Sequence, residues 1–399
     1  MRMCGGTKQF RRGAALLVVL FIVMAVTLIS LGFVARSDRE LACGANMETR
    51  MQMDYMAQTG LTHAKNFIIN PQTVDIEAVG YWQGDTGKYI EDTGDYYDVS
   101  VTRNSSDSTN HCDYTIVSQG YRLDAGDKVS QSTMTGNLRL DPCVALWVGN
   151  TYTSETQVRI YGDVYCGGQL KGSADINGDA FAVSSVSASH VEGDKNASVT
   201  SFPVTFPNMD SSDLIPSYRI GSTTYSAEVL PNVIYNDYYG PTMSNPAGIY
   251  YKYGDLTSWG YVYVYGTLIV TGDLYVRGAS TQVVKSKTSY NGLDTNDFPA
   301  LIVGDDLEFS DYGQLYVEGL AQIKDRIYVD SNCNGSYLSV LGGLFIEDND
   351  IDISGGASTN IWVRIVAAPE LTALRYRKAS GGYKEWVSVG GSYFKAMSR

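Results

Sequence analysis

Oxygen-bearing side chains suited to calcium gather between residues 330 and 352. Asp330, Asn332 and Asn334 alternate and are followed by Gly335, as in the first half of an EF-hand loop. The match is incomplete, because Leu341 stands where that loop needs a bidentate acid. Three further aspartates alternate along a strand-like run, namely Asp348, Asp350 and Asp352. One strand face would carry all three, so either solvent or a bound calcium must relieve their repulsion.

Catalytic motifs are scarce in the rest of the chain. The three histidines lie far apart, at His63, His111 and His190. We find no serine nucleophile elbow, paired-histidine zinc motif, P-loop or dinucleotide-binding glycine pattern. Asp305, Asp306 and Arg326 are residue types that a calcium-dependent polysaccharide lyase needs, but their spacing does not distinguish them from turn residues. We therefore predict a non-enzymatic protein with no cofactor, calcium being the one open candidate.

Six cysteines allow a disulfide if the chain reaches an oxidising compartment. Cys112 and Cys143 flank a predicted sheet, and a bond between them would close a loop of about thirty residues, worth roughly 3 to 4 kcal/mol. Spacing alone cannot decide cysteine pairing. Cys112 with Cys143 is the pairing that we predict.

The scaffold that positions these residues begins with an apolar run. Residues 14–35 carry no charge, and Arg11 and Arg12 precede them. Twenty-two helical residues rise about 33 Å, enough to cross the roughly 30 Å hydrocarbon core of a bilayer. The basic flank should stay in the cytoplasm, so the body should be periplasmic or extracellular. The sequence predicts a single-pass protein of a bacterial inner membrane.

The basic leader ends in glycine directly before this uncut apolar run, at Gly13-Ala14. Residues 55–64 read Tyr-Met-Ala-Gln-Thr-Gly-Leu-Thr-His-Ala. The first feature resembles the class III signal of type IV pilins and type II secretion pseudopilins, and the second is similar to the PilX N-terminal family and K-type minor pseudopilins. The resemblance implies that prepilin peptidase removes residues 1–13 and that Ala14 is a candidate for N-methylation. An ordinary signal-anchor is the alternative.

One position departs from the pilin pattern. After cleavage the fifth residue is Val18, where major pilins carry a glutamate thought to pair with a neighbour's N-terminal ammonium. K-type minor pseudopilins resemble this chain in lacking that acid. The resemblance therefore implies a minor pilin-like or pseudopilin subunit of a type IV pilus or type II secretion filament, with other pilin-like subunits as partners.

Proline spacing predicts that the helix continues beyond the membrane, over residues 14–70. No proline occurs from Arg36 to Ile69, and the first follows at Pro71. Three strand-like runs come next, at 96–103, 114–123 and 129–140, with turn-forming residues between them. They predict an antiparallel pilin-like sheet within residues 71–143.

Residues 144–376 follow a different pattern, in which short apolar runs end in Gly-Asp pairs. Examples are Gly162-Asp163, Gly178-Asp179 and Gly272-Asp273. Such runs at near-coil spacing favour a β-solenoid-like domain, with a β-sandwich as the alternative. Six of the ten prolines lie within residues 198–251, which predicts an excursion laid across the domain or exposed as a loop. Residues 377–399 form a basic tail, and the predicted fold class is α+β.

Charge narrows the set of partners. The formal charge of −13 argues against nucleic acid, which requires a basic face. The 30 tyrosines offer stacking faces for a surface glycan or the cell wall, so the β-rich domain could serve adhesion, capping or partner binding. Two alternatives remain open: a static envelope protein with a binding or structural β-domain, and a β-helix polysaccharide lyase.

Overall fold

The computed structural model has one long helix followed by a mostly β-strand chain, an α+β arrangement. It describes residues 10–69, 81–90, 94–104, 110–141, 143–154, 157–202, 217–220, 222–278, 281–284, 289–291, 293–294, 299–329, 334–348, 351–352, 360–368 and 393–396. The chain forms two compact units. One comprises Met1–Thr62, Asp85–Val99 and Val117–Met134, and the other comprises His63–Gly84, Ser100–Ile116 and Thr135–Arg399.

Helix α1 spans Phe10–Ile69 and contains 60 residues without a proline. It ends as predicted, but it starts four residues before the predicted cleavage point, because nothing in residues 10–13 breaks a helix. Gly13 costs only about 1 kcal/mol there. The two halves of the helix differ in burial. Side chains from Leu16 to Val34 are exposed, whereas Met53 and Ala57 are fully buried.

A five-stranded sheet follows the helix, with strand order β1-β2-β3-β4-β36. Its strands are β1 (Gly84–Ile90), β2 (Asp95–Arg103), β3 (Asp113–Asp124), β4 (Asp127–Asp141) and β36 (Tyr393–Ala396). Ala125 and Gly126 join β3 to β4 with φ of 51° and 96°, the left-handed pair that a two-residue hairpin turn requires. The three predicted strands match β2, β3 and β4 within two residues. β1 was not predicted, and β36, which pairs antiparallel with β4, falls in the predicted tail.

Two glycines allow α1 and the sheet to approach closely within the first unit. A Cβ at Gly120 of β3 would lie 2.6 Å from the backbone nitrogen of Ala57, and a Cβ at Gly60 of α1 would lie 2.9 Å from a methyl of Val99. Real Cβ atoms do not approach so closely. The second half of α1 is thus seated on β2 and β3 at backbone distance.

Beyond Cys143 the strands form three parallel sheets, which we call the ten-strand, nine-strand and six-strand sheets. The ten-strand sheet holds, in spatial order, β13 (Lys195–Asn196), β11 (Ala180–Ala182), β8 (Asp163–Cys166), β5 (Val144–Val148), β33 (Leu344–Ile346), β30 (Ala321–Ile323), β27 (Leu301–Val303), β22 (Thr267–Val270), β19 (Ile249–Lys252) and β16 (Glu228–Val229). The nine-strand sheet holds β12 (His190–Val191), β10 (Asp175–Asn177), β7 (Val158–Tyr161), β35 (Asn360–Ala367), β32 (Asn334–Gly342), β29 (Gln314–Glu318), β24 (Thr281–Val284), β21 (Val262–Tyr265) and β18 (Tyr238–Tyr239). The six-strand sheet holds β17 (Val233–Tyr235), β20 (Leu256–Trp259), β23 (Leu274–Arg277), β28 (Leu307–Ser310), β31 (Ile327–Val329) and β34 (Ile351–Asp352).

Three strand pairs complete the element list. β6 (Tyr152–Ser154) pairs parallel with β9 (Leu170–Gly172). β14 (Ser217–Ile220) pairs antiparallel with β15 (Thr223–Ser226). β25 (Ser289–Tyr290) pairs antiparallel with β26 (Leu293–Asp294).

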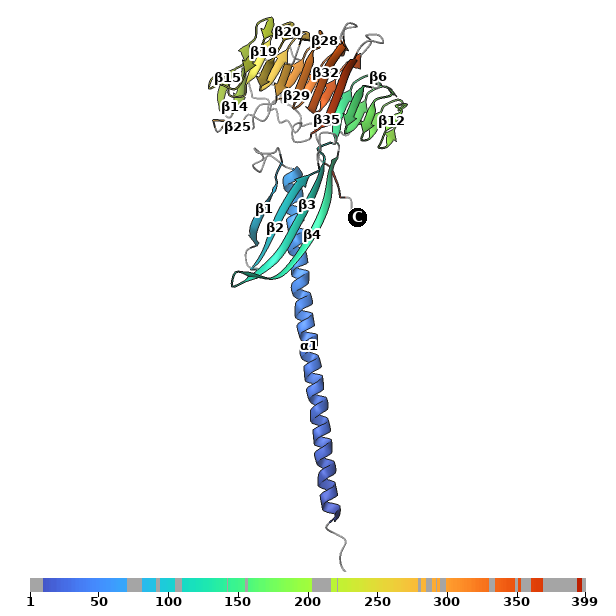
Figure 1. Cartoon of the computed structure of the whole chain (residues 1–399), viewed down its shortest axis with the longest axis vertical. Helices are drawn as coiled ribbons and strands as arrows, with labels where there is room; N and C mark the ends of the chain where they lie inside the picture. The colour runs from blue at the N-terminus through green and yellow to red at the C-terminus, as the bar shows by residue number, and fades with distance from the viewer. Residues whose placement is uncertain are drawn as a thin grey trace, which may run out of the picture. The chain divides into compact units, whose positions relative to one another are not determined.

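The chain enters this stack of sheets in the middle rather than at an end. β5 is paired with β8 on one side and with β33 on the other. The chain first winds outward from β5 to β13, resumes at β16 at the opposite end, and winds back to β33 (Figure 1). The ten-strand sheet spans nine strand intervals, about 43 Å. Residues 197–227 connect its two ends, and a fully extended chain of that length reaches about 100 Å.

The described residues of that connection pack against one face of the ten-strand sheet. Tyr165, Ile302 and Phe345 on that face of the sheet are 0%, 2% and 0% exposed. Tyr218 of β14 belongs to the same buried cluster, and Phe202 packs against it. The proline-rich excursion was predicted to extend to residue 251. It is shorter, because residues 228–252 contribute strands to all three sheets.

Candidate functional site

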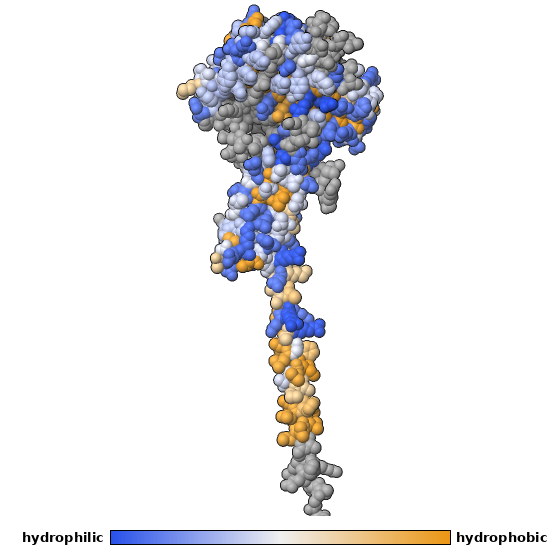
Figure 2. Space-filling view, viewed as in Figure 1, coloured by the Kyte–Doolittle hydropathy of each residue, from blue (hydrophilic) through white to orange (hydrophobic). Residues whose placement is uncertain are grey.

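The first half of α1 is a candidate membrane span. Its most apolar stretch has a mean hydropathy of 2.9, and none of that stretch is buried within the chain. Orange residues dominate this part of the helix in Figure 2. The helix is therefore long and apolar enough to cross a bilayer. Val18 lies on it, 58% exposed, and Gly13 and Ala14 lie in its first turns.

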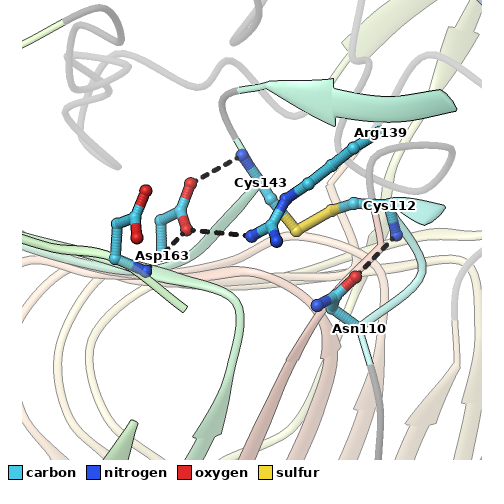
Figure 3. Close-up of a disulfide and its surroundings, with 6 residues drawn as sticks. Asn110, Cys112, Arg139, Cys143 and Asp163 are labelled. Atoms are coloured by element: carbon cyan, nitrogen blue, oxygen red, sulfur yellow. Dashed lines mark hydrogen bonds and ion pairs between the residues drawn. A yellow bond between two sulfur atoms is a disulfide. The ribbon is translucent and has the colours of Figure 1, made fainter. Parts of the chain in front are cut away.

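A disulfide joins Cys112, just before β3, to Cys143, just before β5, with the Cα atoms 5.9 Å apart (Figure 3). This is the predicted pairing. Backbone bonds surround it, since His111 N donates to Ala367 O at 2.9 Å and Leu140 N donates to Cys112 O at 2.8 Å. The bond thus fixes the point where the chain passes from the small sheet to the first parallel strand.

Asp163 lies beside this disulfide and is only 2% exposed. Its Oδ2 accepts a hydrogen bond from Cys143 N at 3.0 Å, its Oδ1 accepts one from Asp179 N at 3.0 Å, and Arg139 Nη2 lies 3.5 Å from Oδ1 (Figure 3). Burial raises the pKa of Asp163 to about 6, and these hydrogen bonds and Arg139 only partly oppose that rise.

Asp163 begins one of two series of hydrogen bonds that we call aspartate ladders. In each ladder the carboxylate of one aspartate accepts a hydrogen bond from the backbone N–H of an aspartate in the next coil, which gives the aspartate of the recurring Gly-Asp pairs a structural role. Asp179 N bonds to Asp163 Oδ1, and Asp194 N bonds to Asp179 Oδ1 at 2.8 Å. The second ladder repeats the geometry at the corner between the ten-strand and six-strand sheets: Asp273 N bonds to Asp255 Oδ1, and Asp306 N bonds to Asp273 Oδ1, both at 3.1 Å. The carboxylates of Asp163, Asp179, Asp255 and Asp273 thus each accept a backbone hydrogen bond from the following coil.

The second ladder ends in an acidic cluster. Asp305, Asp306 and Asp325 each place a carboxylate oxygen within 4.8 Å of the others. Arg326 Nε donates to Asp306 Oδ2 at 3.0 Å. Burial raises the pKa of Asp305, and Asp273, Asp306 and Asp325 raise it further. Three carboxylates suit a hard cation, but the guanidinium already bound to Asp306 opposes a second positive charge there. Asp305, Asp306 and Arg326, which their spacing in sequence did not distinguish from turn residues, lie together in the structure.

The residues predicted for calcium do not form one described site. Asp330, Asn332 and Asp350 lie outside the described residues. Asn334 begins β32 of the nine-strand sheet, and Asp352 ends β34 of the six-strand sheet. Asp348 lies in the turn after β33, so it does not share a strand with Asp352, and the predicted run of alternating aspartates is wrong at that position.

Exposed aromatic side chains mark a further corner, between the six-strand and nine-strand sheets. Tyr235, Trp259 and Tyr312 are 61%, 41% and 61% exposed; Tyr235 and Trp259 end β17 and β20, and Tyr312 lies in the turn after β28. The sequence analysis noted the many tyrosines but could not select these. What distinguishes these three residues is a glycine at the same corner of the next coil. That glycine can be recognised only when the register between coils is known, and the sequence does not provide it.

Comparisons with protein-family models, with curated proteins and with solved structures found no match.

Proposed function

We propose that this chain is a minor pilin-like or pseudopilin subunit, processed by prepilin peptidase between Gly13 and Ala14. The observation that carries the proposal is the division of α1. Its first half is apolar and exposed, as a segment that inserts in a bilayer or in a bundle of helices must be, and its second half is seated on a small sheet through Gly60 and Gly120. An ordinary membrane anchor needs no such seat.

The strand pairing supports a β-solenoid for residues 144–368. Neighbouring strands in all three large sheets are parallel, and β22, β27 and β30 pair residue for residue. A β-sandwich is built from antiparallel pairs, so this pairing favours the solenoid. The solenoid would be displayed outside the membrane for adhesion, capping or partner binding.

A polysaccharide-acting enzyme is the second candidate, because Asp305, Asp306 and Arg326 lie at one corner. Against it, Asp306 is tied into the coil, because its N–H donates to Asp273 Oδ1 and its Oδ2 accepts from Arg326 Nε. Calcium-dependent release of product from an envelope polysaccharide would favour the enzyme over the filament subunit.

Intact mass of the protein recovered from its native membrane tests the proposal. We expect a chain that begins at Ala14, with or without one added methyl, and that copurifies with other pilin-like subunits. Gly13→Val should leave the leader uncut. Gly32→Val is the matched control, because Gly32 lies in the same apolar helix with open space around its Cα. A wild-type chain that retains residues 1–13 would overturn the pilin proposal and leave a static envelope protein.

A further inference from the structure

The aromatic corner, defined as Tyr235, Trp259 and Tyr312, has a repeated construction. A Cβ at Gly260 would lie 3.5 Å from Cε2 of Tyr235, and a Cβ at Gly278 would lie 3.4 Å from Nε1 of Trp259. At the third position, a Cβ at Gly335 would lie 3.5 Å from Cδ1 of Tyr312. Each ring therefore lies beside a glycine at the same corner of the next coil, and at Gly260 the Asn236 amide lies closer than the ring of Tyr235.

These glycines also hold backbone conformations that other residues avoid. The φ angles of Gly260, Gly278 and Gly335 are +72°, +72° and +86°. Any side chain there would be strained and would meet the ring of the preceding coil. The rings consequently have support on one side, while 41% to 61% of each residue remains exposed to solvent.

Hydrogen bonds between coils hold the corner rigid. Asn236 N donates to Trp259 O at 3.3 Å, and Asn236 Oδ1 accepts from Tyr261 N at 2.8 Å. Gly278 N donates to Asp311 O at 3.0 Å. The backbone that carries the rings is therefore ordered when the protein folds, so a ligand that binds there has to order only the rings themselves.

Charge and geometry narrow the class of ligand. Asp237 and Asp311 are exposed carboxylates close in sequence to Tyr235 and Tyr312, and Arg277 pairs in register with Trp259 in the coil between them. The charges at the corner are therefore mixed, and the whole chain carries −13, which favours a neutral ligand over a polyanion. Tyr235 and Trp259 occupy adjacent coils, about 4.8 Å apart along the stack, and Tyr312 lies two coils farther. A row about 14 Å long of aromatic faces suits an extended ligand with several apolar faces in sequence.

We propose that the aromatic corner binds a neutral polysaccharide, whose sugar rings stack their C–H faces on Tyr235, Trp259 and Tyr312. This inference names a ligand for the β-region, and it rests on the proposed function, in which that region is displayed outside the membrane. The sugars' hydroxyls would face solvent and the flanking carboxylates, which accept hydrogen bonds.

Binding of the full-length protein in detergent to insoluble cellulose, chitin and starch tests the proposal, with an alginate gel as the polyanionic counter-probe. We expect depletion from solution by at least one neutral polysaccharide and not by alginate. The combined variant Tyr235→Ala/Trp259→Ala/Tyr312→Ala should bind at least tenfold more weakly. Tyr89→Ala/Tyr253→Ala is the matched control, because these tyrosines are 50% and 77% exposed and belong to β1 and to the turn before β20; it should bind within twofold of wild type.

A conservative variant separates stacking from general damage. Tyr235→Phe/Tyr312→Phe keeps the ring faces, so it should retain binding within about threefold, while its thermal melt should match that of the alanine variant. The proposal is overturned if wild type binds none of the neutral polymers, if it prefers alginate, or if the alanine variant binds like wild type. The intact-mass experiment is independent: an unprocessed chain that binds polysaccharide would refute the filament subunit alone, and a processed chain that does not bind would refute the aromatic corner alone.

Discussion

Asp163 should make the stability of the β-region fall as the pH rises from about 4 to about 6. Its pKa is raised from 3.8 to about 6 in the folded chain, chiefly because the carboxyl is buried. Below pH 4 the group is protonated in both folded and unfolded states. Between the two values only the folded protein holds the proton, and above pH 6 a buried charge remains. This rise in the pKa of Asp163 corresponds to about 3 kcal/mol of unfolding free energy, lost in full only well above pH 6.

The measurement is urea unfolding followed by tryptophan fluorescence at pH 4 and pH 7.5, for wild type and for Asp163→Asn. The asparagine cannot ionise, so wild type should lose about 2 kcal/mol more than the variant between the two pH values, the remainder having been lost below pH 4. Other acids contribute equally to both proteins and cancel in this difference. Arg139→Gln provides a second check. Its cation lies 3.5 Å from the carboxylate and lowers the pKa, so its removal should extend the fall to higher pH. Equal pH dependence of wild type and Asp163→Asn would refute the reasoning.

Further predictions concern the disulfide and the helix seat. Cys112→Ser/Cys143→Ser should lower the free energy of unfolding by roughly 3 to 4 kcal/mol, since the bond closes a separation of 31 residues; a loss below 1 kcal/mol in the same urea titration, with the wild-type bond verified by mass, would contradict this. Gly120→Ala should destabilise the first unit by more than 2 kcal/mol, because its Cβ would meet the backbone of α1. Gly44→Ala is its control and should stabilise α1 by up to about 1 kcal/mol, because that exposed helical position has open space around it. Similar melts for the two alanine variants would argue against a close seat.

Several features could be predicted because they depend on neighbours in sequence. The absence of proline from Arg36 to Ile69 is enough for a continuous helix, and alternation with intervening turns is enough for β2, β3 and β4. Where prediction was wrong, distant contacts decided. Residues 228–252 contain prolines and were assigned to an excursion, yet strands β16, β17 and β18 form there because β19, β20 and β21 offer them edges.

The sequence by itself determined an apolar helix, a small β-meander and a glycine-rich β-region, because each is written in local periodicity, charge and turn chemistry. Tertiary structure alone decided the path through the stack, in which β5 enters between β8 and β33 although about 200 residues separate β5 from β33. It also decided the sites. Asp163 is buried, and Tyr235, Trp259 and Tyr312 share one corner, because the coils stack in one particular register. Hydrogen bonds and packing between residues far apart in the chain set that register, and no short stretch of sequence contains it.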